Sequence, residues 1–396
     1  MERQVTIREI AKKAGVSTAT VSNVIHGRTR RVSPATIERV RGIMESMGYG
    51  GGAEGVNGWG GASGYVGAGG CAASRPRLVA LVVNTRKTYE DAIGADPFYG
   101  KMIGMVEQCL RQRGYYMIFY SASDIDDIFQ MAMSWKMDGV ITITSSKNDC
   151  RKIAGLMNCP LVSIDAYGPQ TNLVNIGLDD WQGGYIMTQY LMECGYNPIY
   201  VCAGRNSGVD HLRYEGCRAA GKEETDAAEP AGKKKDRLQI RFAPLGMDKS
   251  QRKAAFEGLV RPVTADIQRG GRPALFCLSD MYALEALSFF TSRGMKIPED
   301  LGIAGFDDIF CSSIVYPGLT TVRQDMKRKA ELAVERLAAQ MEGGNGHAGK
   351  SVCTDECVQD IFLPVKLVAR GSACPIAPSG RKPAPDYIQD GKDRMI

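Results

Sequence analysis

Eight short apolar runs, separated by stretches with helical patterning, constrain the fold of this chain from residue 78 onward. The runs lie at 78–83, 115–120, 139–144, 160–165, 198–203, 238–243, 273–278 and 301–306. Their apolar residues are continuous rather than alternating, which is typical of parallel strands in a sheet that is covered on both faces. Because eight predicted strands with their helices are more than we expect in a single sheet, we expect a core at 78–371 built from two doubly wound parallel-sheet α/β subdomains.

Three segments outside these runs have a different composition. Glycine supplies 11 of the 21 residues at 50–70, and glycine loses the most conformational freedom on ordering, so 50–77 is predicted to be a flexible linker. Residues 219–237 are charged and rich in alanine and glycine, which predicts an exposed loop. Residues 372–396 carry four prolines and many charges, which predicts a disordered tail.

The first 49 residues predict a small all-helical head. Thr6 and Glu9 have the spacing of a capping box at the start of a helix. Gly15 can end that helix, since a left-handed residue is least strained as glycine. Ser17 and Ser33 are placed to cap a second and a third helix. Two short helices joined by a tight turn at Gly15 have the spacing of a helix-turn-helix unit.

The excess positive charge of the chain lies in this head. Residues 1–49 hold nine Lys and Arg against four Asp and Glu, a balance of +5 that equals the formal net charge of the whole chain. The remaining residues are therefore neutral in sum. A compact basic domain favours contact with phosphate groups, as a nucleic-acid-binding module requires.

The second helix of the head presents short polar side chains on its exposed face. They are Ser17, Thr18, Ala19, Ser22 and Asn23. Side chains of this size can enter a major groove about 12 Å wide and reach base edges or phosphates. The alternative is a plain helical hairpin whose polar residues only face water. Capping, the position of the glycine and the charge together favour DNA binding.

The sequence gives little support to catalysis, metal binding or a cofactor. The 12 cysteines include no Cys-x-x-Cys pair, and the three histidines lie far apart, so a zinc site is not expected. Gly67, Gly69 and Ala72 match a dinucleotide fingerprint by spacing, but no predicted strand precedes them. No phosphate loop or nucleophile elbow occurs. We expect no enzyme activity, no cofactor, no membrane span, reduced thiols and, without a secretory signal, a cytoplasmic protein.

The segment VTIREIAKKAGVSTATVSNVIHGRTRRVSPATIERVRGIMESMGY closely resembles the DNA-binding head of the lactose/galactose repressor family. The resemblance continues through most of 78–371, for example in DGVITITS, PLVSIDAY and IAGFDDIFCSSIVYPGLTTVRQDM. It implies a core with the fold of type I periplasmic binding proteins. It also implies a bacterial, nucleoid-associated regulator, usually a repressor, that binds double-stranded operator DNA as a homodimer and senses a sugar or similar small effector.

The resemblance assigns DNA contacts to residues of the head. The positions that read bases are Thr18, Ala19 and Asn23, of which Ala19 suits a thymine methyl group and Asn23 an adenine. The positions that contact the DNA backbone are Thr6, Ser17, Thr20, Ser22, His26, Ser33, Thr36 and Tyr49. Backbone contacts set the register of the protein on DNA and carry no sequence information.

The resemblance also assigns an effector site in the core. Its expected residues are Asp96, Phe98, Ser145, Asp165, Arg213 and Asp307. Ser145, Asp165 and Asp307 follow predicted parallel strands, whose carboxyl ends are where ligands of such sheets bind. Aspartate acceptors and a forked arginine donor suit a polyol, with Phe98 or Trp181 against its apolar face. Helix capping is the competing role for carboxylates: it is favoured for Asp280 and equally weighted for Asp179 and Asp180.

One segment departs from the family pattern. Relatives follow the head with a hinge helix that enters the minor groove and wedges a base step. Here Tyr49 runs directly into glycine, and only Ala72-Ala73-Ser74 is similar to the hinge motif, without its leucine. The alternative function is therefore a cytoplasmic solute-binding sensor whose head does not bind operator DNA specifically. No leucine heptad marks the C-terminus, so a dimer is expected rather than a tetramer.

Overall fold

The structure is a computed structural model with two compact units, Met1–Pro76 and Arg77–Ile396. It describes residues 6–25, 32–46, 77–84, 93, 96–122, 127–128, 137–157, 159–169, 173–227, 238–343 and 360–375. The predicted linker up to residue 76, the part of the predicted loop at 228–237 and the part of the predicted tail at 376–396 lie outside the described residues. None of the described helices is long and apolar enough to cross a membrane.

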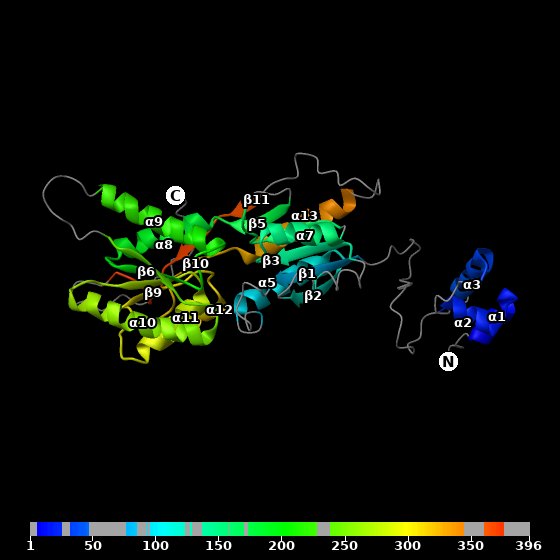
Figure 1. Ribbon diagram of the computed structural model, residues 1–396, viewed down its shortest axis with the longest axis horizontal. Helices are drawn as coiled ribbons and strands as arrows, with labels where there is room; N and C mark the ends of the chain where they lie inside the picture. The colour runs from blue at the N-terminus through cyan, green and yellow to red at the C-terminus, as the bar shows by residue number, and fades with distance from the viewer. Residues whose placement is uncertain are drawn as a thin grey trace. The chain divides into compact units, whose positions relative to one another are not determined.

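The head contains the three predicted helices (Figure 1). They are α1 (Ile7–Ala14), α2 (Thr18–Ile25) and α3 (Pro34–Ser46). The capping box is confirmed: the Thr6 hydroxyl accepts from the Glu9 N–H, and the Glu9 carboxylate accepts from the Thr6 N–H at 2.9 Å. Gly15 ends α1 in the left-handed region with φ 63°, so α2 can turn back onto α1. The buried Ile10, Val21 and Val40 join the three helices in one small core.

The first lobe of the core is a six-stranded sheet in the order β11-β5-β4-β3-β1-β2, with every pair of neighbours parallel. Its strands are β1 (Leu78–Asn84), β2 (Tyr116–Ala122), β3 (Gly139–Ile143), β4 (Leu161–Ile164), β5 (Val174–Leu178) and β11 (Asp360–Leu363). The helices of this lobe are α5 (Pro97–Gln112), α7 (Lys147–Met157) and α13 (Met326–Gly343). Apolar side chains of α5 and α13 pack in one core cluster, and those of α7 pack in a second. Covering both faces explains why the strands are apolar throughout.

The second lobe is a four-stranded parallel sheet in the order β7-β6-β8-β9. Its strands are β6 (Ile199–Ala203), β7 (Ile240–Pro244), β8 (Ala274–Cys277) and β9 (Gly302–Ala304). Its helices are α8 (Asp180–Glu193), α9 (Val209–Ala227), α10 (Lys249–Gln268), α11 (Asp280–Thr291) and α12 (Phe310–Ile314). Figure 1 shows this lobe beside the first, joined by several chain crossings. The two doubly wound subdomains predicted from the apolar runs are confirmed.

The chain crosses between the lobes after β5, again after β10, and again near β11. Strand β10 (Thr321–Arg323) pairs antiparallel with β12 (Lys366–Val368) and leads directly into α13 of the first lobe. Strand β11 returns to the first sheet beside β5 before β12 is formed. These crossings tie the carboxyl-end loops of both sheets together.

Two boundaries differ from the sequence prediction. Helix α9 continues to Ala227, so the predicted loop at 219–237 begins as helix in its first nine residues. The predicted tail begins with packed residues: the buried Ser372 hydroxyl donates to the Ile303 carbonyl oxygen at 2.5 Å and accepts from the Thr320 N–H at 2.9 Å. Local composition could not reveal either feature, because both depend on contacts with distant strands.

Candidate functional site

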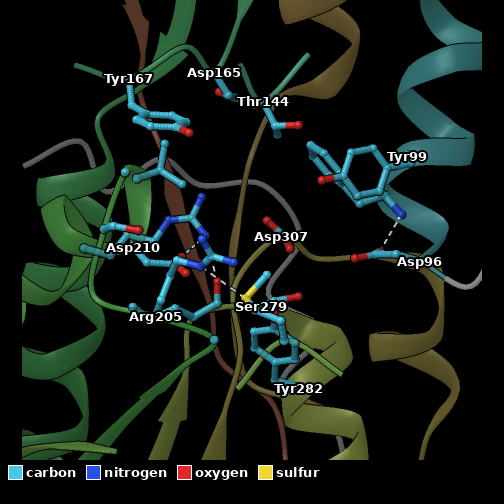
Figure 2. Close-up of a pocket in the computed structure, with 18 of the residues that line it drawn as sticks. Asp96, Tyr99, Thr144, Asp165, Tyr167, Arg205, Asp210, Ser279, Tyr282 and Asp307 are labelled. Atoms are coloured by element: carbon cyan, nitrogen blue, oxygen red, sulfur yellow. Dashed lines mark hydrogen bonds and ion pairs between the residues drawn. The ribbon is translucent and has the colours of Figure 1, made fainter. Parts of the chain in front are cut away.

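A cavity of about 170 Å³ opens in the core unit at the carboxyl ends of strands from both lobes. Thr144 and Asp165 reach it directly after β3 and β4, and Asp307 reaches it from the loop after β9. Figure 2 shows Thr144, Asp165 and Tyr167 facing Ser279 and Tyr282 across the space. The remaining lining comes from Asp96, Phe98, Tyr99, Gly204, Arg205, Ser207, Gly208, Val209, Asp210, Arg213, Met247, Leu278 and Gln324. This is the edge where parallel sheets bind ligands.

Three lining residues have strained backbones. Thr144 has φ 54°, Asp165 φ 55° and Asp307 φ 120°, all values that favour glycine. Such conformations cost about 1–3 kcal/mol each and persist only where the surroundings impose them. The strain coincides with the residues that turn polar side chains toward the cavity, which supports a binding role for this edge.

Arg213 is held rigidly at the cavity by α9 and its neighbours. Its Nε donates to Asp180 Oδ1 at 2.8 Å, and its Nη1 donates to the Leu278 carbonyl oxygen at 2.7 Å. The guanidinium also lies 3.6 Å from the centre of the Phe306 ring. A guanidinium fixed on three sides has lost its rotamer freedom before a ligand arrives, so binding does not need to order it.

The position of Arg213 depends on two glycines in α8. A Cβ at Gly184 would overlap the carbonyl oxygen of Arg213, and one at Gly183 would lie 2.6 Å from the Phe306 ring. Across the same crossing, a Cβ at Gly216 would overlap the carbonyl oxygen of Trp181. Helices α8 and α9 therefore pack backbone against backbone, which brings Arg213 to the cavity.

Two lining carboxylates are held in environments that disfavour their charge. Burial raises the pKa of Asp307 well above its ordinary value, although nearby Arg213 lowers it. Burial raises the pKa of Asp210 to about 6, again against the lowering effect of Arg213. Asp307 Oδ1 accepts from Gln324 Nε2 at 2.7 Å. Hydroxyl groups of a ligand could donate hydrogen bonds to these carboxylate oxygens and so replace the hydrogen bonds to water that burial removes.

Aromatic rings supply the apolar part of the cavity. Asp96 caps α5 by accepting from the Phe98 N–H at 2.9 Å, and the Phe98 ring meets Tyr99 edge to face with 5.3 Å between centroids. Burial raises the pKa values of Tyr99 and Tyr282 above their ordinary value, so both phenols stay neutral hydrogen-bonding groups. Rings beside fixed carboxylates and a guanidinium suit a small polyol with one apolar face.

Five of the six residues expected at the effector site line this cavity: Asp96, Phe98, Asp165, Arg213 and Asp307. Ser145 does not. It is fully buried, and its Oγ has no hydrogen-bond partner among the described residues, while the preceding Thr144 lines the cavity instead. Both residues follow the end of β3, where the left-handed backbone at Thr144 (φ 54°) reorients the chain.

The expected position of Trp181 is also corrected. Its ring is not part of the cavity lining and stacks on Tyr185 with 5.1 Å between centroids. Phe98 therefore remains as the ring expected against the apolar face of a ligand.

The acidic residues for which the sequence allowed either helix capping or ligand contact have separate structural roles. Asp179 caps α8 by accepting from the Gln182 N–H, whereas Asp180 pairs with Arg213. Asp280 is not the cap of α11, because Ser279 has that role. Instead its buried carboxylate accepts from the Ile309 N–H and from the hydroxyls of Ser312 and Thr321 at 2.6–2.9 Å.

Several cavity residues were not anticipated from the sequence. Tyr99, Tyr167, Arg205, Asp210, Tyr282 and Gln324 line it from loops or helix starts whose proximity is set by the fold. A position shortly after an apolar run was the available signal for Tyr167, Arg205 and Tyr282, whereas Tyr99, Asp210 and Gln324 had no such signal. Lys329 was also missed, and it is buried beside Asp165.

In the head, the residues expected to read bases lie on α2, with Thr18 and Ala19 exposed and Asn23 half-buried. Ser17 and Ser33 begin α2 and α3, and their hydroxyls accept from the N–H groups of Thr20 and Thr36. Thr6 is exposed and Ser22 half-buried, whereas His26 and Tyr49 lie outside the described residues. Exposed helix starts with capping hydroxyls suit phosphate contacts.

Comparison with known proteins finds a family match in each of the two units. The model "Bacterial regulatory proteins, lacI family" matches residues 6–50, and "Periplasmic binding protein-like domain" matches residues 188–372. The chain is 28% identical over 349 residues to the HTH-type transcriptional repressor PurR of Haemophilus influenzae (strain PittEE), covering 85% of this chain and 93% of that protein. It is 28% identical over 382 residues to the HTH-type transcriptional regulator DegA of Bacillus subtilis (strain 168), covering 94% and 98%.

Solved structures support the same fold. The transcriptional regulator CelR–cellobiose complex has a TM-score of 0.58 at 23% identity, covering 93% of this chain and 99% of that one. The lac repressor dimer bound to operator and the anti-inducer ONPF has a TM-score of 0.57 at 20% identity, covering 94% and 100%. The relatives named here are transcriptional regulators rather than enzymes. The chain therefore combines a helix-turn-helix domain of the lacI family with a periplasmic-binding-protein-like core.

Proposed function

We propose that this protein is a ligand-responsive transcriptional regulator, acting as a repressor, that binds operator DNA through its head and a sugar-like metabolite in its cleft. The observation that carries the proposal is the combination in one chain of a basic helix-turn-helix head and a cleft lined by Asp165, Arg213 and Asp307. The relatives PurR and DegA are named as a repressor and a regulator. The cleft lining offers no arrangement we would assign to catalysis, so we do not propose an enzyme.

Sequence reading is assigned to α2. Thr18 and Ala19 are exposed on it, and Asn23 is one turn further along the helix. An amide can form two hydrogen bonds with an adenine edge, and a methyl-bearing side chain can contact a thymine methyl group. The capping hydroxyls of Ser17 and Ser33 would meet backbone phosphates at helix starts, where N–H groups and the helix dipole favour an anion.

Effector binding is assigned to the cavity between the lobes of the core. Arg213 and the carboxylates of Asp165 and Asp307 supply a donor and acceptors in fixed positions, and Phe98 supplies an apolar surface. This chemistry matches a neutral polyol. Two solved proteins of this fold contain cellobiose and ribose, so we take mono- and disaccharides as candidate effectors.

We assign the contact with a second copy of the chain to an exposed apolar patch around α12. Phe310 is 72% exposed, Ile314 64% and Tyr316 96%, which is unusual for large apolar side chains on a free surface. The lac repressor, which shares this fold, was solved as a dimer on its operator. Two copies would present two heads, and two α2 helices can then read the half-sites of a pseudo-palindromic operator.

The coupling between the two sites is assigned to closure of the cleft. An effector that contacts both lobes binds the closed arrangement better than the open one, and this difference is the free energy available to change operator affinity. We place the protein in the cytoplasm at the nucleoid, where operator DNA and metabolites are both present.

Selection from random duplexes with the full-length protein tests the proposal. We expect enrichment of one pseudo-palindromic site, with binding altered by a sugar that raises the melting temperature of the protein. A sugar-dependent melting temperature without any enriched site would favour the alternative, a solute-binding sensor. That alternative is kept because the glycine-rich segment at 50–70 replaces the expected hinge motif.

A further inference from the structure

Lys329 on α13 is a fully buried lysine beneath the effector cleft. Its side chain is 0% exposed, and its Nζ donates to both Asp165 carboxylate oxygens at 2.8 Å and to Gln324 Oε1 at 2.7 Å. An ammonium group has three protons, so these contacts use its full donor capacity. A buried charge is tolerated only when it is paired and hydrogen-bonded in this way.

The contact with Lys329 fixes the orientation of the Gln324 amide. Because Lys329 can only donate, it must meet the amide oxygen, and the amide nitrogen is then directed away from it. That nitrogen donates to Asp307 Oδ1 at 2.7 Å. A reversed amide would place a donor against the ammonium and an acceptor against the carboxylate, so the chain Lys329–Gln324–Asp307 has one workable orientation.

This network joins two of the acidic residues that line the cleft, one from each lobe. Asp165 follows β4 of the first sheet, and Asp307 follows β9 of the second. Gln324 lies between β10 and α13, at a crossing between the lobes, and is itself part of the cavity lining. Asp307 Oδ2 accepts no hydrogen bond within the described part of the chain, and Figure 2 shows the Asp307 carboxylate beside the open space.

We propose that Lys329 is the positioning residue of the effector site: it holds Asp165 directly, and Asp307 through Gln324, as two fixed acceptors that select a neutral ligand with hydroxyl donors facing both lobes. This inference rests on the proposed function of the cleft as the effector site. It goes further by naming the group that sets ligand selectivity. Both carboxylates would bind an acidic ligand poorly, Lys329 is too fully engaged to bind its anion, and Arg213 is already paired with Asp180.

Calorimetry on the full-length protein tests the selectivity, with D-ribose, D-glucose and cellobiose as neutral probes and D-glucuronate as the acidic probe. Wild type should prefer a neutral probe to D-glucuronate. Lys329→Met should bind the preferred neutral probe at least tenfold more weakly than wild type does. Lys327→Met, at an exposed lysine two residues away, should change the affinity for the same neutral probe less than twofold. Unchanged affinity in Lys329→Met, or a wild-type preference for D-glucuronate, would overturn the inference. Failure of every probe to bind wild type would instead count against the proposed effector class.

A second measurement needs no ligand and separates positioning from a simple ion pair. The unfolding equilibrium is measured for wild type, Lys329→Met, Asp307→Asn and the double variant, and again with Gln324→Ala as the background. A relay through Gln324 predicts at least fivefold coupling between positions 329 and 307 that disappears in the Gln324→Ala background. If Lys329 only neutralises Asp165, the two substitutions are independent in both backgrounds, and that result overturns the relay even if no sugar is ever found.

Discussion

Gly184 on α8 is pressed against the carbonyl oxygen of Arg213 on α9, so closely that a Cβ at position 184 would overlap that oxygen. The same arginine points its guanidinium to the cavity, where Asp180 and the Leu278 carbonyl oxygen hold it. The closest packing between the two helices is therefore coupled to the position of the main donor in the cleft. A residue outside the cavity lining therefore controls the position of one that lines it.

Replacing Gly184 with alanine should displace α9 and move Arg213 out of place. We expect a loss of about 1–3 kcal/mol in the free energy of unfolding and a loss of sugar affinity of at least tenfold. Urea unfolding and calorimetry measure the two effects. Gly155→Ala is the matched control, because this glycine lies in α7 with nothing within 4 Å of an added Cβ, and it should stabilise the protein by about 0.5–1 kcal/mol. Equal behaviour of the two variants would argue against the close crossing.

Removing either charged anchor of the cleft should abolish the effector response while leaving operator binding intact. In the proposed site, Arg213→Ala and Asp307→Ala would each delete a charge-assisted hydrogen bond to the ligand, worth about 1.5–3 kcal/mol. Arg218→Ala, at an exposed position of the same helix α9, is the control and should respond as wild type. Gel-shift titration with and without the sugar is the measurement. If the Arg213→Ala and Asp307→Ala variants lost operator affinity even when no sugar is present, these residues would act on folding instead.

Asn23→Ala should change the base preference at one position of each half-site. The expected cost is about 1–3 kcal/mol against the preferred base and much less against the others. Ser33→Ala, at a predicted phosphate contact, should weaken binding to all sequences by similar factors. Competition binding with single-substitution operators distinguishes the two patterns. A uniform loss for Asn23→Ala would mean that this residue does not read a base.

The raised pKa of Asp210, about 6, gives a pH-dependent stability with a defined sign. The folded protein holds the carboxyl proton more tightly than the unfolded chain does. Ionisation of Asp210 therefore lowers the free energy of unfolding as pH rises from 4 to 6. The advantage of Asp210→Asn over wild type should therefore grow by about 1–3 kcal/mol between pH 4.5 and 7.5.

Urea titrations across that pH range provide the measurement, and Asp248→Asn provides a control of opposite sign. Hydrogen bonds from Ser250 and the Gln251 N–H lower the pKa of Asp248, so its contribution to stability is lost as pH falls. A pH-independent difference between Asp210→Asn and wild type would contradict the assigned environment of Asp210.

Much of the fold could be predicted because it depends on local patterns. All eight apolar runs coincide with strands, and the capping box at Thr6 and the turn at Gly15 occur as expected. Strand β5, with five residues, was not anticipated, and neither were β10, β11 and β12, which have three or four residues each. Their pairing brings together residues that are far apart in sequence, as when β11 joins β5, so no local pattern reveals it.

The site was predictable only in part, for related reasons. Residues directly after strands, such as Asp165, could be placed at the cleft because parallel strands end at one edge. Ser145 was misplaced by a single residue, because no local pattern reveals the left-handed backbone at Thr144 that reorients the chain after β3. Lys329 could not be foreseen, since a lysine on an amphipathic helix normally faces water, and only the contact with Asp165 explains its burial.

Footprinting with the intact protein at moderate ionic strength tests the central claim most directly. A selected pseudo-palindromic duplex is probed with and without the sugar that stabilises the core. The account predicts a protected operator whose occupancy changes when the sugar is added, in wild type but not in Arg213→Ala. Absence of any protected site under both conditions would contradict it.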